Sequence, residues 1–168
     1  MSDFLVYIKL PAYEREWCHH HFGDPCRFPS QSNVNNVIRH FIKLRPDNCI
    51  PEGRKPDEIA VCIPSSKSKQ PSSYNFLTKS GKEAIAEAIN DIFIIDMWES
   101  LTNTGTRNVS VRKLVSDWME GNGISSENFD NLRQKFIRIC DSYRKNSGLN
   151  LTRGYKHEHT RKKTRKIR

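Results

Sequence analysis

The second half of the chain contains three stretches in which apolar residues recur every three or four positions, the spacing of an amphipathic helix. The first stretch follows Ser80 and Glu83, which have the spacing of a capping box at a helix N-terminus. Breaks rich in glycine and asparagine separate the stretches at 103–108 and 121–123. We therefore expect three helices that share a core, with these inward residues: Ile85, Ala88, Ile89, Ile92, Phe93, Met97 and Leu101; Val111, Leu114, Val115 and Trp118; Phe129, Leu132, Phe136, Ile139, Cys140 and Tyr143.

The first half of the chain carries signals for both strands and helices. Apolar residues alternate over 3–10, and the run over 58–63 suits a buried strand. Two helices are expected between these strands, one over about 11–21 and one with an apolar stripe from Val34 to Ile42. The spacing predicts a mainly helical α+β fold, in which a small N-terminal sheet and two helices precede a three-helix bundle. We expect three parts: an N-terminal α/β subdomain over 1–78, a three-helix subdomain over 79–148 and a basic tail over 149–168.

The net charge of +9 is concentrated at the C-terminal end. Residues 153–168 hold eight Lys or Arg and one Glu, a balance of 8 − 1 = +7, so residues 1–152 carry only 9 − 7 = +2. With almost no apolar residues to fold around, this tail is expected to be disordered and to bind polyanions, although a basic run also serves as a plain solubilising end. Its candidate phosphate-binding residues are Arg153, Lys156, Arg161, Lys162, Lys163, Arg165, Lys166 and Arg168.

The stretch from Trp17 to Cys26, written WCHHHFGDPC, has the residue types of a metal site. On a helix, Cys18 and His21 would share one face and Cys26 would follow the turn, which supplies three ligands. A closed zinc site needs four ligands, usually from two short-spaced pairs, and the sequence offers no second pair. We therefore expect no zinc here and interpret the histidines as a helix end, where they lie near the last carbonyl groups.

Sequence patterns that mark an active site or a membrane segment are missing from the chain. It contains no GxSxG, no glycine loop for phosphates and no HExxH, so we expect a non-enzymatic protein without a cofactor. The longest apolar run, Ile92 to Ile95, is far shorter than a membrane span. Because residues 1–10 do not have the pattern of an export signal, the five cysteines are expected to be reduced thiols of a cytoplasmic protein.

The segment over about 112–145 has the order of features found in a DNA-binding helix pair. A helix ends in a glycine-containing turn, an apolar residue follows, and a second helix begins with Ser125 or Ser126 as its cap. The segment resembles the helix-turn-helix superfamily, in which the second helix is the recognition helix that enters the major groove. Met119 and Asn122 depart from the pattern, which prefers a small residue and an apolar residue there. The matching positions are Trp118, Gly123, Ile124, Phe129 and Leu132.

The polar side of the expected recognition helix, over 126–145, supports the same interpretation. Asn and Gln side chains read adenine and Arg reads guanine when such a face lies in the major groove, while Lys suits phosphates. The face contains no Glu, whereas an ordinary solvated face usually mixes both signs of charge. A plain exposed surface is the alternative. The candidate DNA-binding residues are Asn131, Gln134, Lys135, Arg138, Ser142, Arg144 and Lys145.

Two functions from different classes follow from these features. In the first, the protein is a DNA-binding regulator of transcription, or an accessory factor of a phage or mobile element, that reads sequence with the helix and holds phosphates with the tail. In the second, it is a protein assembly factor or RNA-binding factor in which the tail alone binds polyanions. The N-terminal half is a candidate dimerisation or partner domain in either case, so a homodimer is left open.

Overall fold

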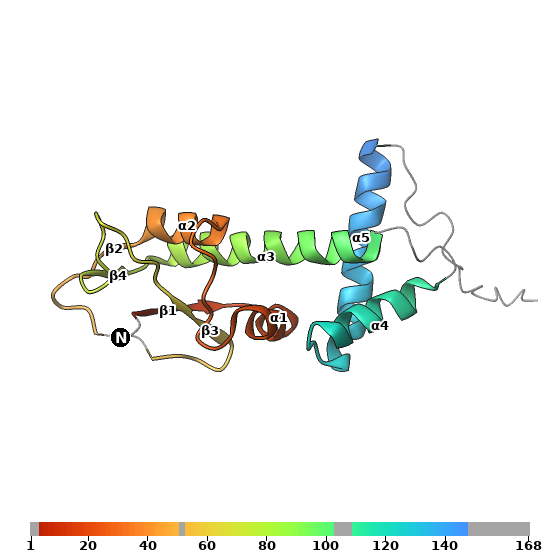
Figure 1. Ribbon diagram of the computed structural model, residues 1–168, viewed down its shortest axis with the longest axis horizontal. Coiled ribbons are helices and arrows are strands. Elements are labelled where there is room, and N and C mark those ends of the chain that lie inside the picture. The colour runs from red at the N-terminus through yellow and green to blue at the C-terminus, as the bar shows by residue number, and fades with distance from the viewer. Residues whose placement is uncertain (1–3, 51–52, 103–108, 148–168) are drawn as a thin grey trace, which may run out of the picture.

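The computed structural model describes residues 4–50, 53–102 and 109–147 and shows a mainly helical α+β fold (Figure 1). Within these ranges there are five α-helices and two small antiparallel sheets of two strands each. The expected fold class is therefore confirmed. The predicted basic tail over 149–168 lies outside the described residues. Among the helices of the described ranges, none combines the length and the apolar character needed to cross a membrane.

The first sheet pairs β1, Leu5–Lys9, with β3, Glu58–Cys62, at the places where the sequence predicts strands. The two strands are antiparallel, so Leu5 lies opposite Cys62 and Lys9 lies opposite Glu58. Alternate side chains of β1 point inward, so Val6 and Ile8 are buried, which reflects the period of two in the sequence. The first helix, α1, Ala12–Phe22, follows β1 directly.

The second sheet pairs β2, Lys43–Leu44, with β4, Tyr74–Phe76, and the sequence does not reveal it. β2 follows α2, Asn33–Phe41, and both residues of β2 are exposed. Two residues are too short for an alternating pattern, and the chain that leads to β4 has the polar composition of a loop. This sheet lies at one end of the elongated molecule (Figure 1).

The longest helix, α3, Lys79–Thr102, joins the two ends of the molecule (Figure 1). Its 24 residues span about 36 Å, because each residue adds 1.5 Å. The first turns pack against α2 and β1, and Gly81 allows α2 to come close, since a Cβ there would lie 3.2 Å from Phe41 Cβ. At the other end, α4, Val111–Gly121, packs against α3 and against α5, Phe129–Ser147.

Thr78 caps the N-terminus of α3, two residues before the serine of the expected capping box. Its Oγ1 accepts a hydrogen bond from the N–H of Gly81 at 3.3 Å, and its carbonyl accepts one from the N–H of Lys82 at 3.0 Å. Ser80 already lies inside the first turn, so the predicted box of Ser80 and Glu83 is wrong. The physical reason is that threonine is also a good cap, and it reaches the free amides first.

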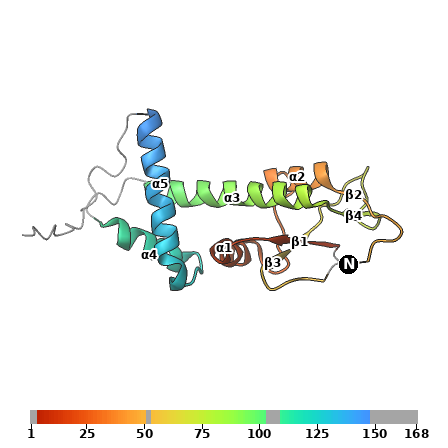
Figure 2. The same cartoon turned by 180° about the vertical axis from the view of Figure 1, so that it is seen from behind.

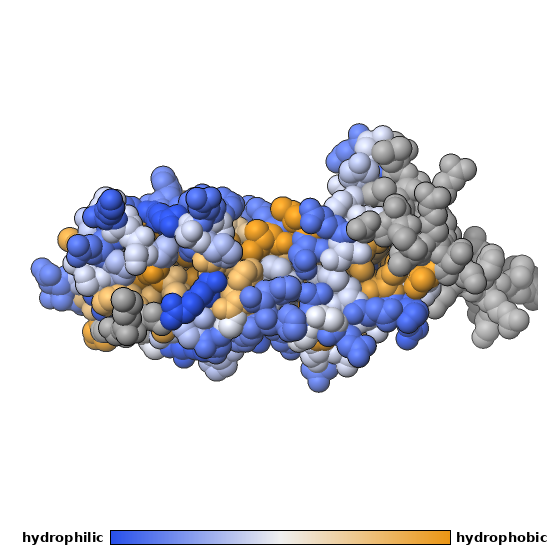
Figure 3. Space-filling model, in the orientation of Figure 1, coloured by the Kyte–Doolittle hydropathy of each residue, from blue (hydrophilic) through white to orange (hydrophobic). Residues whose placement is uncertain are grey.

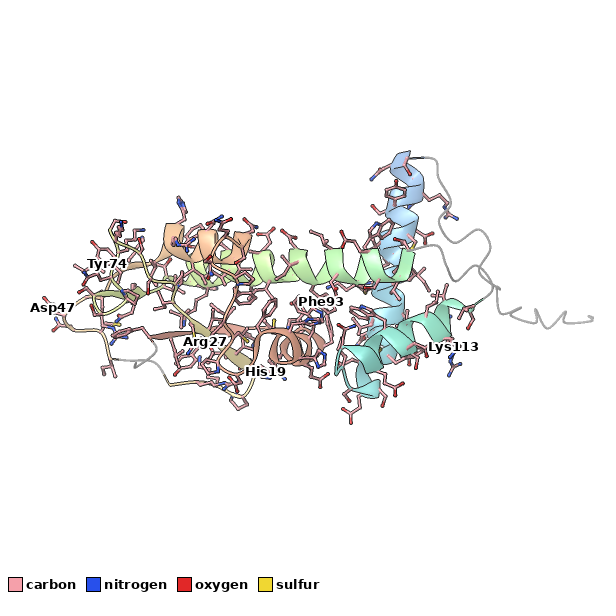
Figure 4. All side chains as sticks on the ribbon, in the orientation of Figure 1. His19, Arg27, Asp47, Tyr74, Phe93 and Lys113 are labelled. Carbon is pink, nitrogen blue, oxygen red and sulfur yellow. The ribbon has the colours of Figure 1, made fainter. Side chains whose placement is uncertain are left out.

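One continuous hydrophobic core runs through both predicted subdomains, from Val6 in β1 to Cys140 in α5. Phe93 of α3 is fully buried, and its ring centroid lies 5.5 Å from that of Trp17 in α1 and 5.6 Å from that of Trp118 in α4. Figure 4 shows Phe93 pointing from α3 toward the space between α1 and α4. The two predicted subdomains therefore pack into one body.

Most residues that the sequence predicts to face inward in α3, α4 and α5 are buried or half-buried. Tyr143 is the exception among them, because its side chain is 39% exposed. It lies in the last turns of α5, beyond most of the core, and its ring still packs near Trp98 of α3 with a centroid distance of 5.2 Å. The inward prediction for this residue is therefore wrong.

Candidate nucleic-acid interface

A tight turn followed by a short 3-10 helix connects α4 to α5. Gly123 has a φ of 66°, a conformation that glycine adopts without steric cost. Ile124 is buried and donates its N–H to the carbonyl of Met119 at 2.9 Å. Ser125 caps the 3-10 helix, Ser126–Asn128, which leads into α5. The resemblance to the helix-turn-helix superfamily stays a prediction. The 3-10 helix makes the connection between α4 and α5 longer than a single turn.

Helix α1 braces this turn from the N-terminal half of the chain. The Glu16 carboxylate accepts hydrogen bonds from the N–H of Ser125 at 2.8 Å and from the side-chain amide of Asn128 at 3.2 Å. His21 Nε2 lies 2.7 Å from Asn122 Oδ1. These partners are 101 to 112 residues apart in the sequence, so no local pattern could reveal the contacts. The histidine-rich helix end therefore also holds the turn that precedes α5.

Five of the predicted DNA-binding residues form one exposed stripe along α5. The stripe repeats at intervals of three or four residues, which keeps its members on one side of a helix. α5 stands across the end of α3 and projects beyond it (Figure 2), and hydrophilic residues cover its projecting end (Figure 3). Arg144 is exposed as well, and its guanidinium forms a 3.0 Å ion pair with Asp141. The residues of this exposed stripe are Asn131, Gln134, Arg138, Ser142 and Lys145.

Lys135 does not belong to the exposed stripe, and its prediction as a solvent-facing residue is wrong. Its side chain is 23% exposed, and its ammonium lies 3.3 Å from Glu14 Oε1 and 2.8 Å from Asn90 Oδ1. The same ammonium lies 5.2 Å from the ring centroids of Tyr13 and Phe93. On α5 this residue flanks the buried stripe, and its long aliphatic stem reaches a carboxylate that another helix supplies.

Glu14 of α1 is a buried carboxylate at the point where three helices meet. It is 2% exposed and pairs with Lys135 of α5, which also bonds Asn90 of α3. Burial raises the pKa of the Glu14 carboxyl above its ordinary value, because desolvation disfavours the charged form. The Lys135 ammonium opposes that shift in pKa, since a positive charge favours the carboxylate. The pair ties α5 to the body, so Lys135 is occupied and not a free phosphate contact.

Cys18 and Cys26, the two cysteines considered as zinc ligands, are fully buried. Cys26 pairs with β3 through an isolated bridge, in which its N–H donates to the carbonyl of Ala60 at 2.7 Å. Its thiol donates to the carbonyl of Gly23 at 3.1 Å. The hydrogen bond to Cys26, together with burial, raises the pKa of the Cys18 thiol. In the part of the chain that the structure describes, His, Cys, Asp and Glu side chains do not gather in a group of three that could hold a metal.

The sequence holds two further groups of basic residues outside α5. The predicted tail residues, Arg153 to Arg168, lie outside the described residues and stay a prediction. The other group lies in the N-terminal half and was missed: residues 25–46, which include α2, and residues 59–82 hold eight Lys or Arg and no Asp or Glu. Net charge counted in short windows of the sequence would have revealed this group. The acidic residues of 47–58 lower the net charge of the whole N-terminal half, so the total does not reveal it.

No protein-family model, curated protein or solved structure matches this chain.

Proposed function

We propose that this is a non-enzymatic DNA-binding protein that reads duplex sequence with the exposed stripe of α5 and holds phosphates with its C-terminal tail. The observation that carries the proposal is that Asn131, Gln134 and Arg138 share one exposed side of a helix that projects from the body (Figure 2). These side-chain types form bidentate hydrogen bonds with adenine and guanine. α5 has 19 residues and is about 28 Å long, enough to lie along a major groove.

The distribution of charge over the helices favours α5 as the side that meets nucleic acid. α5 holds five Lys or Arg and two Asp, a balance of 5 − 2 = +3. Without Lys135, which is paired with Glu14, the balance is still 4 − 2 = +2. α3 holds two Lys and five Asp or Glu, a balance of 2 − 5 = −3. A polyanion is therefore attracted to α5 and repelled from α3.

The bracing by Glu16 moves the expected DNA contact away from the start of α5. Backbone amides at a helix N-terminus are common phosphate ligands in protein–DNA complexes. Here the N–H of Ser125 already donates to the Glu16 carboxylate, and that negative charge repels a phosphate. We therefore assign base contacts to Asn131, Gln134 and Arg138. The C-terminal end of α5, from which the tail continues, would meet the phosphates.

The N-terminal half has a positioning role in this proposal. Glu14 pairs with Lys135 of α5, and Glu16 and His21 hold the turn that precedes α5. A side chain reads base edges only when its helix is held at a fixed angle in the groove, so such bracing supports specific binding. A protein of this kind would act as a transcriptional regulator or as an accessory factor of a phage or mobile element.

Selection of bound sequences from a random pool of duplex DNA tests the proposal with the full chain. We expect an enriched motif, and we expect the Asn131→Ala, Arg138→Ala double variant to lose it. Lys9→Ala is the matched control, because this side chain is 77% exposed and lies on β1, away from the stripe. A flat pool for the wild type contradicts the proposal and leaves a protein whose tail alone binds polyanions.

A further inference from the structure

A groove at the other end of the molecule has the chemistry of a nucleotide-binding surface. It has a cavity volume of ≈ 380 Å³ and lies between the loop before α2 and the segment that follows β3. Its lining combines two arginines with hydroxyl groups and apolar side chains, and no carboxylate is among the described residues that line it. The main lining residues are Phe4, Arg27, Phe28, Ser30, Arg39 and Ser65.

Basic residues are concentrated in the two segments that form most of this groove. Apart from Phe4, its described lining residues come from 25–46 and 59–82, which together hold eight Lys or Arg and no Asp or Glu. Lys69 lies next to Arg39 and donates from Nζ to the carbonyl groups of Arg39 and Ile42 at 2.6 and 3.2 Å. That ammonium offsets the negative end of the α2 dipole. The two arginines that line the groove therefore favour an anionic ligand.

The arginines of the groove are held in place by the surrounding backbone and side chains. Arg39 folds back along α2, and its Nη2 donates to the carbonyl of Ser30 at 2.8 Å while Nη1 donates to Asn36 Oδ1 at 3.0 Å. The side-chain amide of Asn35 donates to the carbonyl groups of Phe28 and Pro29, at 2.9 and 2.8 Å, and so fixes the loop that carries Arg27. A guanidinium has five N–H donors, and these bonds to Ser30 and Asn36 use two of those on Arg39.

Two aromatic rings line the groove, and the exposed one favours a single strand as the ligand. Phe4 is 38% exposed, although it is a large apolar side chain, and Phe28, which also lines the groove, is buried. In a duplex the faces of the bases are stacked on one another, so an exposed aromatic ring stacks on an unpaired base at a lower energetic cost than on a paired one. Fixed cations beside an exposed ring are the combination that single-strand-binding surfaces use.

We infer that this groove binds single-stranded nucleic acid, with a base stacked on Phe4 and the adjoining phosphate held by Arg27 and Arg39. The inference does not depend on duplex reading by α5, because the groove lies at the end of α3 that carries α2 and the sheets, whereas α5 crosses its opposite end (Figure 1). Arg27 lies in the lobe formed by β1, β3 and α2 (Figure 4). The protein would thus hold a duplex at one end and an unpaired strand at the other.

Fluorescence anisotropy with a labelled oligothymidylate of about 12 nucleotides tests the inference, with a duplex of equal length as comparison. For the full chain, Phe4→Ala is expected to weaken binding of the single strand about ten-fold, because the stacked base loses its aromatic partner, and to leave binding of the duplex unchanged. Arg27→Gln is expected to lower the slope of log affinity against log salt by about 0.7 on the single strand. Ile95→Ala is the matched control, since Ile95 is 54% exposed and lies on α3 outside the groove.

Photocrosslinking with an oligonucleotide that carries 5-iodouracil separates groove binding from binding by the tail. Trypsin releases Phe4 in residues 1–9 and Phe28 in residues 28–39, so mass spectrometry can identify the crosslinked segment. We expect crosslinks in these two peptides, and circular dichroism should show that Phe4→Ala remains folded. Crosslinks confined to 153–168, or a Phe4→Ala variant that binds the single strand as tightly as Ile95→Ala, would overturn the inference.

Discussion

The ammonium of Lys135 on α5 lies 3.3 Å from the carboxylate of Glu14 on α1, so a buried ion pair holds the helix that we propose as the DNA reader. Glu14 is fully within the core, whereas the exposed stripe of α5 faces away from it. This arrangement separates two kinds of polar residue on one helix. Lys135, which orients α5, is paired with a carboxylate of the body, whereas the residues that we propose to contact DNA are exposed to solvent.

Replacing Lys135 with Met tests whether the ion pair with Glu14 stabilises the fold. Met keeps much of the volume of the side chain but removes the charge, which leaves Glu14 buried without its partner. We expect the free energy of unfolding to fall by about 3 kcal/mol, as when one partner of a buried pair is removed. Urea unfolding at neutral pH measures it. The double variant with Glu14→Gln should recover part of the loss, and a loss below about 1 kcal/mol would mean that the pair behaves as an exposed one.

The pH dependence of stability provides a second test of Glu14. Folding raises the pKa of this carboxyl above its ordinary value of 4.5, so the folded state binds more protons than the unfolded state between the two values. The contribution of Glu14 to stability is therefore complete below 4.5 and is lost as the pH rises through the folded pKa. We expect the stability of the wild type relative to Glu14→Gln to decline across this window. Urea unfolding at a series of pH values measures the difference, and a difference that grows with pH contradicts the prediction.

Gly123 and Gly121 form a matched pair for testing the turn before α5. Gly123 has a φ of 66°, and an added Cβ would lie 3.0 Å from His20 Nδ1. We expect Gly123→Ala to destabilise the protein by about 1–2 kcal/mol, through backbone strain and this close approach. Gly121 lies at the end of α4 and has no atom within 4 Å of an added Cβ, so Gly121→Ala should be neutral or slightly stabilising. Thermal unfolding compares the two, and equal effects would show that the turn does not require glycine.

The elements of this fold could be predicted where their residues repeat with a regular period. The three helical stripes of the second half and the strands β1 and β3 lie where the sequence places them. The sheet of β2 and β4 could not be found in this way, because β2 has two residues and pairs with a strand that is distant in the sequence. The cap at Thr78 was missed because Ser80 offers an equally good local signal.

In the candidate site, helical spacing predicts which side chains are exposed, but it does not predict which ones contact another helix. Helical spacing correctly identified five exposed residues of α5, because exposure follows from the position of the apolar stripe. It failed for Lys135, since a residue at the edge of the stripe faces either solvent or a neighbouring helix. Which of these occurs depends on Glu14, 121 residues earlier in the chain. The same holds for Glu16 and His21, whose contacts with the turn depend on how α1 packs.

Deleting residues 153–168 tests the division of labour between the tail and α5. The deletion removes seven net positive charges, so the affinity for duplex DNA should depend less steeply on salt, by about 0.9 in slope for each phosphate that the tail no longer neutralises. We expect the preference for one sequence to remain, because α5 is intact. Binding assays on the selected site and on random DNA over a range of salt concentrations measure both properties. Disappearance of all sequence preference together with the tail would contradict the assignment of specificity to α5.

The most direct test of the central claim is the affinity of Arg138→Ala for the selected DNA site compared with random DNA. Arg138 is exposed on the stripe, and removing its hydrogen bonds to a base edge should cost about 1–3 kcal/mol on the selected site and little on random DNA. Asn131→Ala should behave in the same way, whereas Lys9→Ala should leave both affinities nearly unchanged, because Lys9 lies on β1. If Arg138→Ala and Asn131→Ala weaken binding to both DNAs equally, or change neither, α5 does not read the sequence.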